Sequence, residues 1–122
     1  MATTSAEIAA AVKRFQQQVP ALAKLRLAFG LELTSRGLTG EHEPERFHVV
    51  VPGPQVSEGE AGGERVVIAM PETMFRVLAT EGELADWQEA FHYRHVTVEG
   101  DSRVKRLIGQ AIEPALEAER AS

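Results

Sequence analysis

The sequence contains no cysteine in its 122 residues. This absence excludes disulfides, thiolate zinc sites and thiol nucleophiles, and it is consistent with a reducing compartment. Lys and Arg form no block, and the formal net charge of −5 argues against a nucleic-acid partner or an anionic-membrane patch. No stretch approaches the roughly 20 apolar residues of a membrane span, and the N-terminal residues lack the regions of a signal peptide. We therefore expect a soluble, unprocessed, cytoplasmic protein without stable membrane insertion.

Hydrophobic periodicity divides the first half of the chain into one helix and three or four strands. Thr4 and Glu7 have capping-box spacing, and apolar residues then recur at helical intervals until Pro20. Alternating apolar residues next predict strands at 25–34, 47–51 and 65–70, with a weaker strand at 55–58. The acidic, glycine-rich segment 58–64 is predicted to be a hairpin loop.

Two short helices are predicted in the second half of the chain. Pro71 suits a first helical position and Gly82 suits a C-terminal cap, so residues 72–81 should form a helix. Asp86 and Glu89 have capping spacing for the next helix, whose apolar face must pack against another element. The apolar faces of the two helices consist of Met74, Phe75 and Leu78 and of Trp87, Ala90 and Phe91, respectively.

A strand at 95–99 and a long helix complete the predicted elements. The strand places Val96 and Val98 on one side and polar residues on the other. Asp101 is a good N-cap for the last helix, which Pro114 should bend or interrupt. This helix carries a broad apolar stripe made of Val104, Leu107, Ile108, Ala111, Ile112, Ala115 and Leu116.

This order of elements predicts an α+β layout with a mainly antiparallel sheet, in a single domain over residues 1–122. The apolar faces of the helices need a partner, and one face of the sheet supplies it. The two layers could enclose a solid core or leave an apolar cavity between them. The residue pattern is compatible with both arrangements.

Residues 66–101, VVIAMPETMFRVLATEGELADWQEAFHYRHVTVEGD, resemble the sterol carrier protein type-2-like family of lipid-binding domains in the order and spacing of their elements. The resemblance covers roughly residues 25–112, with LRLAFGLELT and FHVVV in the expected upstream places. The most recognisable point is Glu99-Gly100-Asp101 followed by an amphipathic helix. The resemblance implies a five-stranded, mainly antiparallel sheet covered on one face by about four to five helices. It also implies an apolar tunnel for sterols, fatty acyl chains or related lipids, with no catalytic residue and no cofactor.

The same resemblance assigns candidate ligand-binding residues by matching position. The floor of the cavity would consist of Phe47, Val49, Ile68 and Val98. The helical residues that would line or cover it are Phe75, Leu78, Trp87, Phe91, Val104, Leu107, Ile108 and Ile112, and Tyr93 belongs to the same aromatic cluster. One departure is His92-Tyr93-Arg94, which stands where the family usually has a small residue and Gly. These bulky, polar groups could narrow the mouth of the cavity or bind a polar headgroup.

Other chemistry has weaker support in the sequence. His92 and His95 are only three residues apart, but they flank a turn, so we expect surface histidines and no metal site. Asp101 is explained by capping, and segment 58–64 carries negative charge that would repel phosphate.

Two classes of function remain after this reading. The first is a non-enzymatic domain that binds or transfers an apolar ligand such as a fatty acyl chain, a sterol-like molecule or an isoprenoid lipid. The alternative is a protein-interaction or accessory module with a filled core, acting as a homodimer or with a pathway partner. A small isomerase or hydrolase is a third reading with less support.

Overall fold

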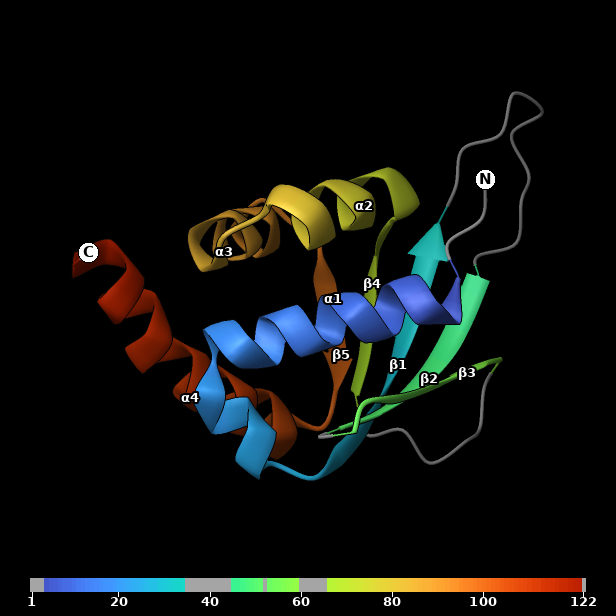
Figure 1. Ribbon diagram of the computed structural model, residues 1–122, viewed down its shortest axis with the longest axis horizontal. Coiled ribbons are helices and arrows are strands. Elements are labelled where there is room, and N and C mark those ends of the chain that lie inside the picture. The colour runs from blue at the N-terminus through green and yellow to red at the C-terminus, as the bar shows by residue number, and fades with distance from the viewer. Residues whose placement is uncertain (1–3, 35–44, 52, 60–65, 122) are drawn as a thin grey trace.

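The computed structural model describes residues 4–34, 45–51, 53–59 and 66–121 (Figure 1). Its elements, in chain order, are α1 (Ser5–Gln18), the 3-10 helix η1 (Pro20–Lys24), β1 (Leu27–Thr34), β2 (Glu45–Val51), β3 (Gln55–Glu58), β4 (Val66–Pro71), α2 (Glu72–Glu81), α3 (Leu84–His92), β5 (Thr97–Gly100) and α4 (Ser102–Ala121). The predicted α+β class is confirmed, with five strands in one sheet.

The sheet has the strand order β3-β2-β1-β4-β5. β1 pairs antiparallel with β2 and parallel with β4, whereas the outer pairs β2–β3 and β4–β5 are antiparallel. The sheet is therefore mixed but mainly antiparallel. The predicted hairpin at 58–64 is wrong, because β2 and β1 lie between β3 and β4 in the sheet. Residues 60–64 of that segment lie outside the described residues.

The helices cover one face of the curved sheet (Figure 1). α1 begins at the predicted cap, where the side-chain oxygen of Thr4 accepts a hydrogen bond from the Glu7 backbone N–H at 3.2 Å. α4 also begins as predicted, because Asp101 Oδ1 accepts a hydrogen bond from the Arg103 backbone N–H at 2.8 Å. Each cap satisfies a backbone donor that has no partner within its own helix.

Several boundaries differ by one or more residues from the sequence-based expectation, and the structure shows the local cause for three of them. β1 begins at Leu27 because Leu25 closes η1, with its backbone N–H donating to the Leu22 carbonyl at 3.1 Å. β5 begins at Thr97, after a turn that follows α3. α3 begins at Leu84, and Asp86 is its third helical residue rather than its N-cap. The Asp86 carboxylate accepts a hydrogen bond from the backbone N–H of residue 83 at 2.9 Å, which completes a capping box one turn earlier than expected.

Pro114 does not interrupt α4, which continues from Ser102 to Ala121. The expected interruption is therefore wrong. The helix is held on both sides of the proline, since Ile112 and Leu116 pack in one apolar cluster with Val19 and Leu84. This packing compensates for the backbone hydrogen bond that proline cannot donate. None of the described helices combines the length and the hydropathy that a membrane span needs.

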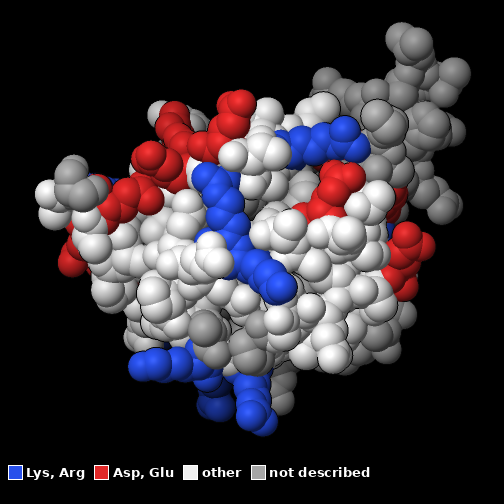
Figure 2. Space-filling view, viewed as in Figure 1, with Lys and Arg blue, Asp and Glu red and all other residues white. Residues whose placement is uncertain are grey.

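Figure 2 shows how charge is distributed over one face of the molecule. Asp and Glu gather where α3 and the end of α4 lie, whereas Lys and Arg lie near η1 and the start of α4 and also across the middle of this face, over α1 and α2. α4 has this polarity in its own sequence, with Arg103, Lys105 and Arg106 in its first turns and Glu113, Glu117 and Glu119 in its second half. This order is the reverse of the one that the helix dipole favours, so it does not arise from helix stability.

Candidate functional site

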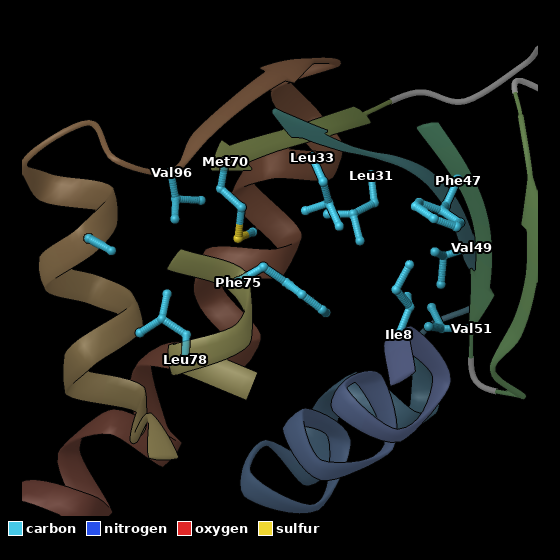
Figure 3. Close-up of a cluster of buried hydrophobic side chains, with 11 residues drawn as sticks. Ile8, Leu31, Leu33, Phe47, Val49, Val51, Met70, Phe75, Leu78 and Val96 are labelled. Carbon is cyan, nitrogen blue, oxygen red and sulfur yellow. The ribbon is translucent and has the colours of Figure 1, made fainter. Parts of the chain in front are cut away.

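The layer between the sheet and the helices is the candidate site. Its floor is made of alternate residues of the central strands, which point toward the helices (Figure 3). Leu31 and Leu33 come from β1, and Phe47, Val49 and Val51 come from β2. All five are buried, because the alternation of each strand places every second side chain on the covered face.

Apolar side chains from three helices meet this floor. Phe75 and Leu78 of α2 and Ala90 of α3 are buried in the same cluster as the strand residues, as is Ile8 of α1. Phe75 and Leu78 are separated by three residues and therefore share one face of α2, which is the spacing that an amphipathic helix requires. We call this group of buried residues the main cluster: Ile8, Leu31, Leu33, Phe47, Val49, Val51, Met70, Phe75, Leu78, Ala90 and Val96.

Two specific contacts link α1 to the short helices α2 and α3 beside the main cluster. The guanidinium of Arg14 on α1 donates a hydrogen bond from Nη1 to the backbone carbonyl of Ala79 on α2 at 2.8 Å. Phe15 on α1 meets Trp87 on α3 edge to face, with the ring centroids 5.6 Å apart. α1 is thus attached to both short helices by one polar and one aromatic contact.

Solved structures of known proteins have the same arrangement. No protein-family model and no curated protein matches the sequence. In three dimensions the chain is similar to the palmitated sterol carrier protein 2-like 2 of Aedes aegypti, with 14% identity and a TM-score of 0.55, covering 86% of this chain and 93% of that one. It is also similar to sterol carrier protein domain 2 of Helicoverpa armigera, with 12% identity and a TM-score of 0.58, covering 84% and 80% of the two chains.

The chain has the sterol carrier protein 2-like fold. A third structure with this fold, the UbiJ-SCP2 ubiquinone synthesis protein, is 13% identical with a TM-score of 0.50 and covers 91% of this chain and 90% of its own. At these identities the likeness concerns the architecture. The family resemblance noted in residues 66–101 is thereby confirmed for the fold.

The sterol carrier protein 2-like fold brings six of the thirteen candidate residues together, and a seventh, Val98 on β5, is half-buried. Phe47, Val49, Phe75 and Leu78 belong to the main cluster, and Ile68 and Trp87 are half-buried against it. These side chains come from β2, β4, α2 and α3. The structure therefore places the floor and the first two helical faces of the predicted site in contact with one another.

Three more candidates lie on the inner side of α4. Val104 is buried, and Ile108 is half-buried. Ile112 packs against a second cluster, which consists of Val19, Leu84 and Leu116. This second cluster joins α4 to the α1–η1 junction and to the start of α3.

The other three candidates are on the surface. Phe91 is 55% exposed, Tyr93 is 64% exposed and Leu107 is 51% exposed. The expectation that Phe91 packs against another element is therefore wrong. On α3 the inner positions are taken by Trp87 and Ala90, and the next residue, one helical step of about 100° further, turns toward solvent.

Sequence patterns do not predict that Leu116 packs with Val19 and Leu84 in the second cluster, nor the contact that completes this cluster. The backbone N–H groups of Leu84 and Ala85 donate to the carboxylate oxygens of Glu119, which lies about 35 residues later in the chain. Among the described residues, no three His, Cys, Asp or Glu side chains are placed to hold a metal ion. His42, one of the four histidines of the chain, lies outside the described residues.

Proposed function

We propose that the chain binds an apolar ligand, such as a fatty acyl chain, a sterol-like molecule or an isoprenoid lipid, between its sheet and its helices, and that it catalyses no reaction. The observation that carries this proposal is the fold that the chain shares with a palmitated structure, and the apolar side chains that meet in the main cluster are those that would separate around a ligand. A ligand in this layer gains about 0.8 kcal/mol for each methylene removed from water, so affinity requires no polar group.

The residues proposed to contact the ligand are the ten candidates that the structure buries or half-buries. They are Phe47, Val49, Ile68, Phe75, Leu78, Trp87, Val98, Val104, Ile108 and Ile112. The ligand would enter by displacing α2 or α3 from the sheet. Both helices are short, at 10 and 9 residues, and such elements are opened at lower free energy than the central strands.

The similar structure from Aedes aegypti supports this proposal because it is palmitated. Palmitate is a fatty acyl ligand, and the fold that accommodates it is shared with this chain. At 14% sequence identity the likeness concerns the fold, so the choice of ligand depends on this chain's own side chains listed above.

Native mass spectrometry of the protein purified from cells, followed by organic extraction, tests this proposal. We expect a mass increment that disappears after extraction and that corresponds to a lipid in the extract. Titration of the extracted protein with a fluorescent fatty acid should then show saturable binding. A protein that carries no ligand and does not bind the fluorescent fatty acid would contradict the proposal.

A second candidate function is an accessory module that acts through its surface, as a homodimer or with a pathway partner. The exposure of Phe91, Tyr93 and Leu107 favours it, because large apolar side chains at the surface are typical of interfaces. The similarity to the UbiJ-SCP2 ubiquinone synthesis protein is consistent with such a role. Sedimentation velocity distinguishes the two functions: a carrier is expected as a lipid-loaded monomer, and this module as a ligand-free dimer.

A further inference from the structure

A pocket of about 300 Å³ lies at the end of the sheet where β1 and β4 finish and β5 begins. Its lining consists of Thr34, Ala69, Met70, Pro71, Arg94, His95 and Thr97. The sheet register pairs Thr34 with Pro71 and Ala69 with Thr97. These four residues alternate with the inward-facing residues Leu33, Met70 and Val98, so they lie on the sheet face opposite the helices.

The chain reaches this pocket through a turn that closes α3. The backbone N–H of Arg94 donates to the Phe91 carbonyl at 3.1 Å, and the N–H of His95 donates to the Ala90 carbonyl at 2.8 Å. These two bonds form a Schellman motif, which requires a left-handed residue at its first position after the cap. Arg94 is that residue, with φ of 63°.

Glycine is the usual residue at such a position because it has no Cβ to clash in the left-handed conformation. Arg94 is the one described non-glycine residue with positive φ. A non-glycine residue in a strained backbone conformation points to a function for its side chain. Arg94 lines the pocket, so we look for that function there.

The polar groups among the described lining residues suit a negatively charged ligand. Arg94 supplies a cation, Thr34 and Thr97 supply hydroxyls and His95 supplies an imidazole, and the described part of the lining includes no Asp or Glu. A guanidinium presents paired N–H donors whose geometry matches the oxygens of a phosphate or a carboxylate.

We propose that this pocket, the Arg94 pocket, binds an oxyanion, namely the phosphate or carboxylate group of a small molecule or of a lipid headgroup. Arg94 donates to two oxygens of the anion, and the hydroxyls of Thr34 and Thr97 donate to the remaining oxygens of a phosphate or to the second lone pairs of a carboxylate. The polar lining residues of the sheet, Thr34 and Thr97, lie on the face that the helices leave uncovered, whereas Met70 belongs to the main cluster.

Titration of the ¹⁵N-labelled full chain with inorganic phosphate tests this site. We expect saturable shifts of the amide signals of Ala69, Arg94, His95 and Thr97. Arg94→Gly should weaken binding at least tenfold while it leaves the melting temperature equal or higher, because glycine adopts the left-handed conformation without strain. Arg94→Lys should retain part of the affinity, since it keeps the charge but not the paired donors.

Arg106→Gln is the matched control, because it removes the same charge from an exposed position on α4. It should bind phosphate as the wild type does. Vesicles of phosphatidylcholine with or without phosphatidic acid distinguish the source of the anion. If only the vesicles with phosphatidic acid retain the protein, and Arg94→Gly abolishes this retention, the anion is a lipid headgroup. Phosphate binding without such retention indicates a small molecule. Equal phosphate binding by the wild type and Arg94→Gly, or no saturable binding of either probe, would overturn the proposal.

Discussion

Glu119 caps a helix that begins at Leu84, on a different part of the chain. Its Oε2 accepts a hydrogen bond from the Leu84 backbone N–H at 2.9 Å, and its Oε1 accepts one from the Ala85 N–H at 3.0 Å. The carboxylate thus lies at the positive end of the α3 dipole and satisfies two of its free donors. Arg120 adds a third link, because its Nη2 donates to the Gln88 side-chain oxygen at 2.7 Å.

Removal of this cap should weaken the attachment of α4. We expect Glu119→Ala to lower the free energy of unfolding by about 0.5–2 kcal/mol, the range observed for loss of helix caps. Urea denaturation followed by circular dichroism measures the change. Glu117→Ala, at an exposed position on the same helix, is the control and should change the free energy by less than about 0.5 kcal/mol. Equal effects of the two substitutions would show that the bonds to α3 contribute nothing.

Replacement of two glycines by alanine should change the stability of the protein in opposite directions. A Cβ on Gly82 would lie 2.6 Å from the Leu78 carbonyl oxygen and 2.8 Å from its Cα, both of which are backbone atoms. We expect Gly82→Ala to destabilise the protein by about 1–3 kcal/mol, because the end of α2 must shift. Gly109 lies inside α4, and a Cβ there would meet nothing within 4 Å. Gly109→Ala should therefore stabilise the protein by about 0.5–1 kcal/mol.

Thermal melts of both variants check this pair. A stable Gly82→Ala variant would indicate that the turn between α2 and α3 is looser than the distances imply. The φ of Gly82 is −72°, so the expected loss comes from the lack of space and not from backbone strain. The helix-end role that the sequence predicts for this glycine is correct, but the reason is close approach rather than a left-handed conformation.

The features that the sequence predicts well depend on neighbours along the chain. Thr4 and Asp101 are caps because their side chains reach backbone groups two or three residues away, and this is visible in the spacing of the residues. The Glu119–Leu84 bond joins residues 35 positions apart, and no local pattern encodes it. The position of β4 beside β1 is likewise a long-range pairing.

In the candidate site, too, some positions follow from local patterns and others depend on tertiary contacts. Strand alternation identifies Phe47 and Val49 as inward-facing because a strand has only two faces. A helix can instead rotate about its axis, and tertiary contacts determine which edge of a broad apolar stripe is buried. Periodicity therefore selects Phe91 and Leu107 together with their buried neighbours, although both are more than half exposed.

Adjacent residues of β4 provide a direct test of the proposed ligand site. Ile68 is half-buried against the main cluster, whereas Val67 is on the other face of the strand and is 37% exposed. We expect Ile68→Phe to reduce the affinity for a fluorescent fatty acid at least tenfold, because the larger side chain occupies space between the layers. Val67→Phe adds the same ring outside that layer and should leave the affinity unchanged. Circular dichroism spectra and melting temperatures identify any variant that fails to fold.

Trp87 gives an independent measurement of the same site, since it is the only tryptophan in the chain. Its ring contacts Phe15 and packs against the main cluster. We expect a saturating fatty acid to change the position or the intensity of tryptophan emission, with the same midpoint as direct binding. The signal is assignable to one residue, so the measurement reports on the layer between α1, α3 and the sheet.

A surface substitution distinguishes ligand binding between the layers, reported by Trp87 emission, from binding at the exposed aromatic residues. Phe91→Asp changes a side chain that is 55% exposed on α3, the helix that also carries Trp87. If the ligand lies between the layers, this variant should bind the fatty acid with the wild-type midpoint and the wild-type change in Trp87 emission, because the interlayer packing is untouched. A variant that folds but loses both signals would place the ligand on the outer surface of α3 instead. Loss of a dimer by the same variant in sedimentation, with no effect on fatty-acid binding, would assign Phe91 to an interface between copies of the chain.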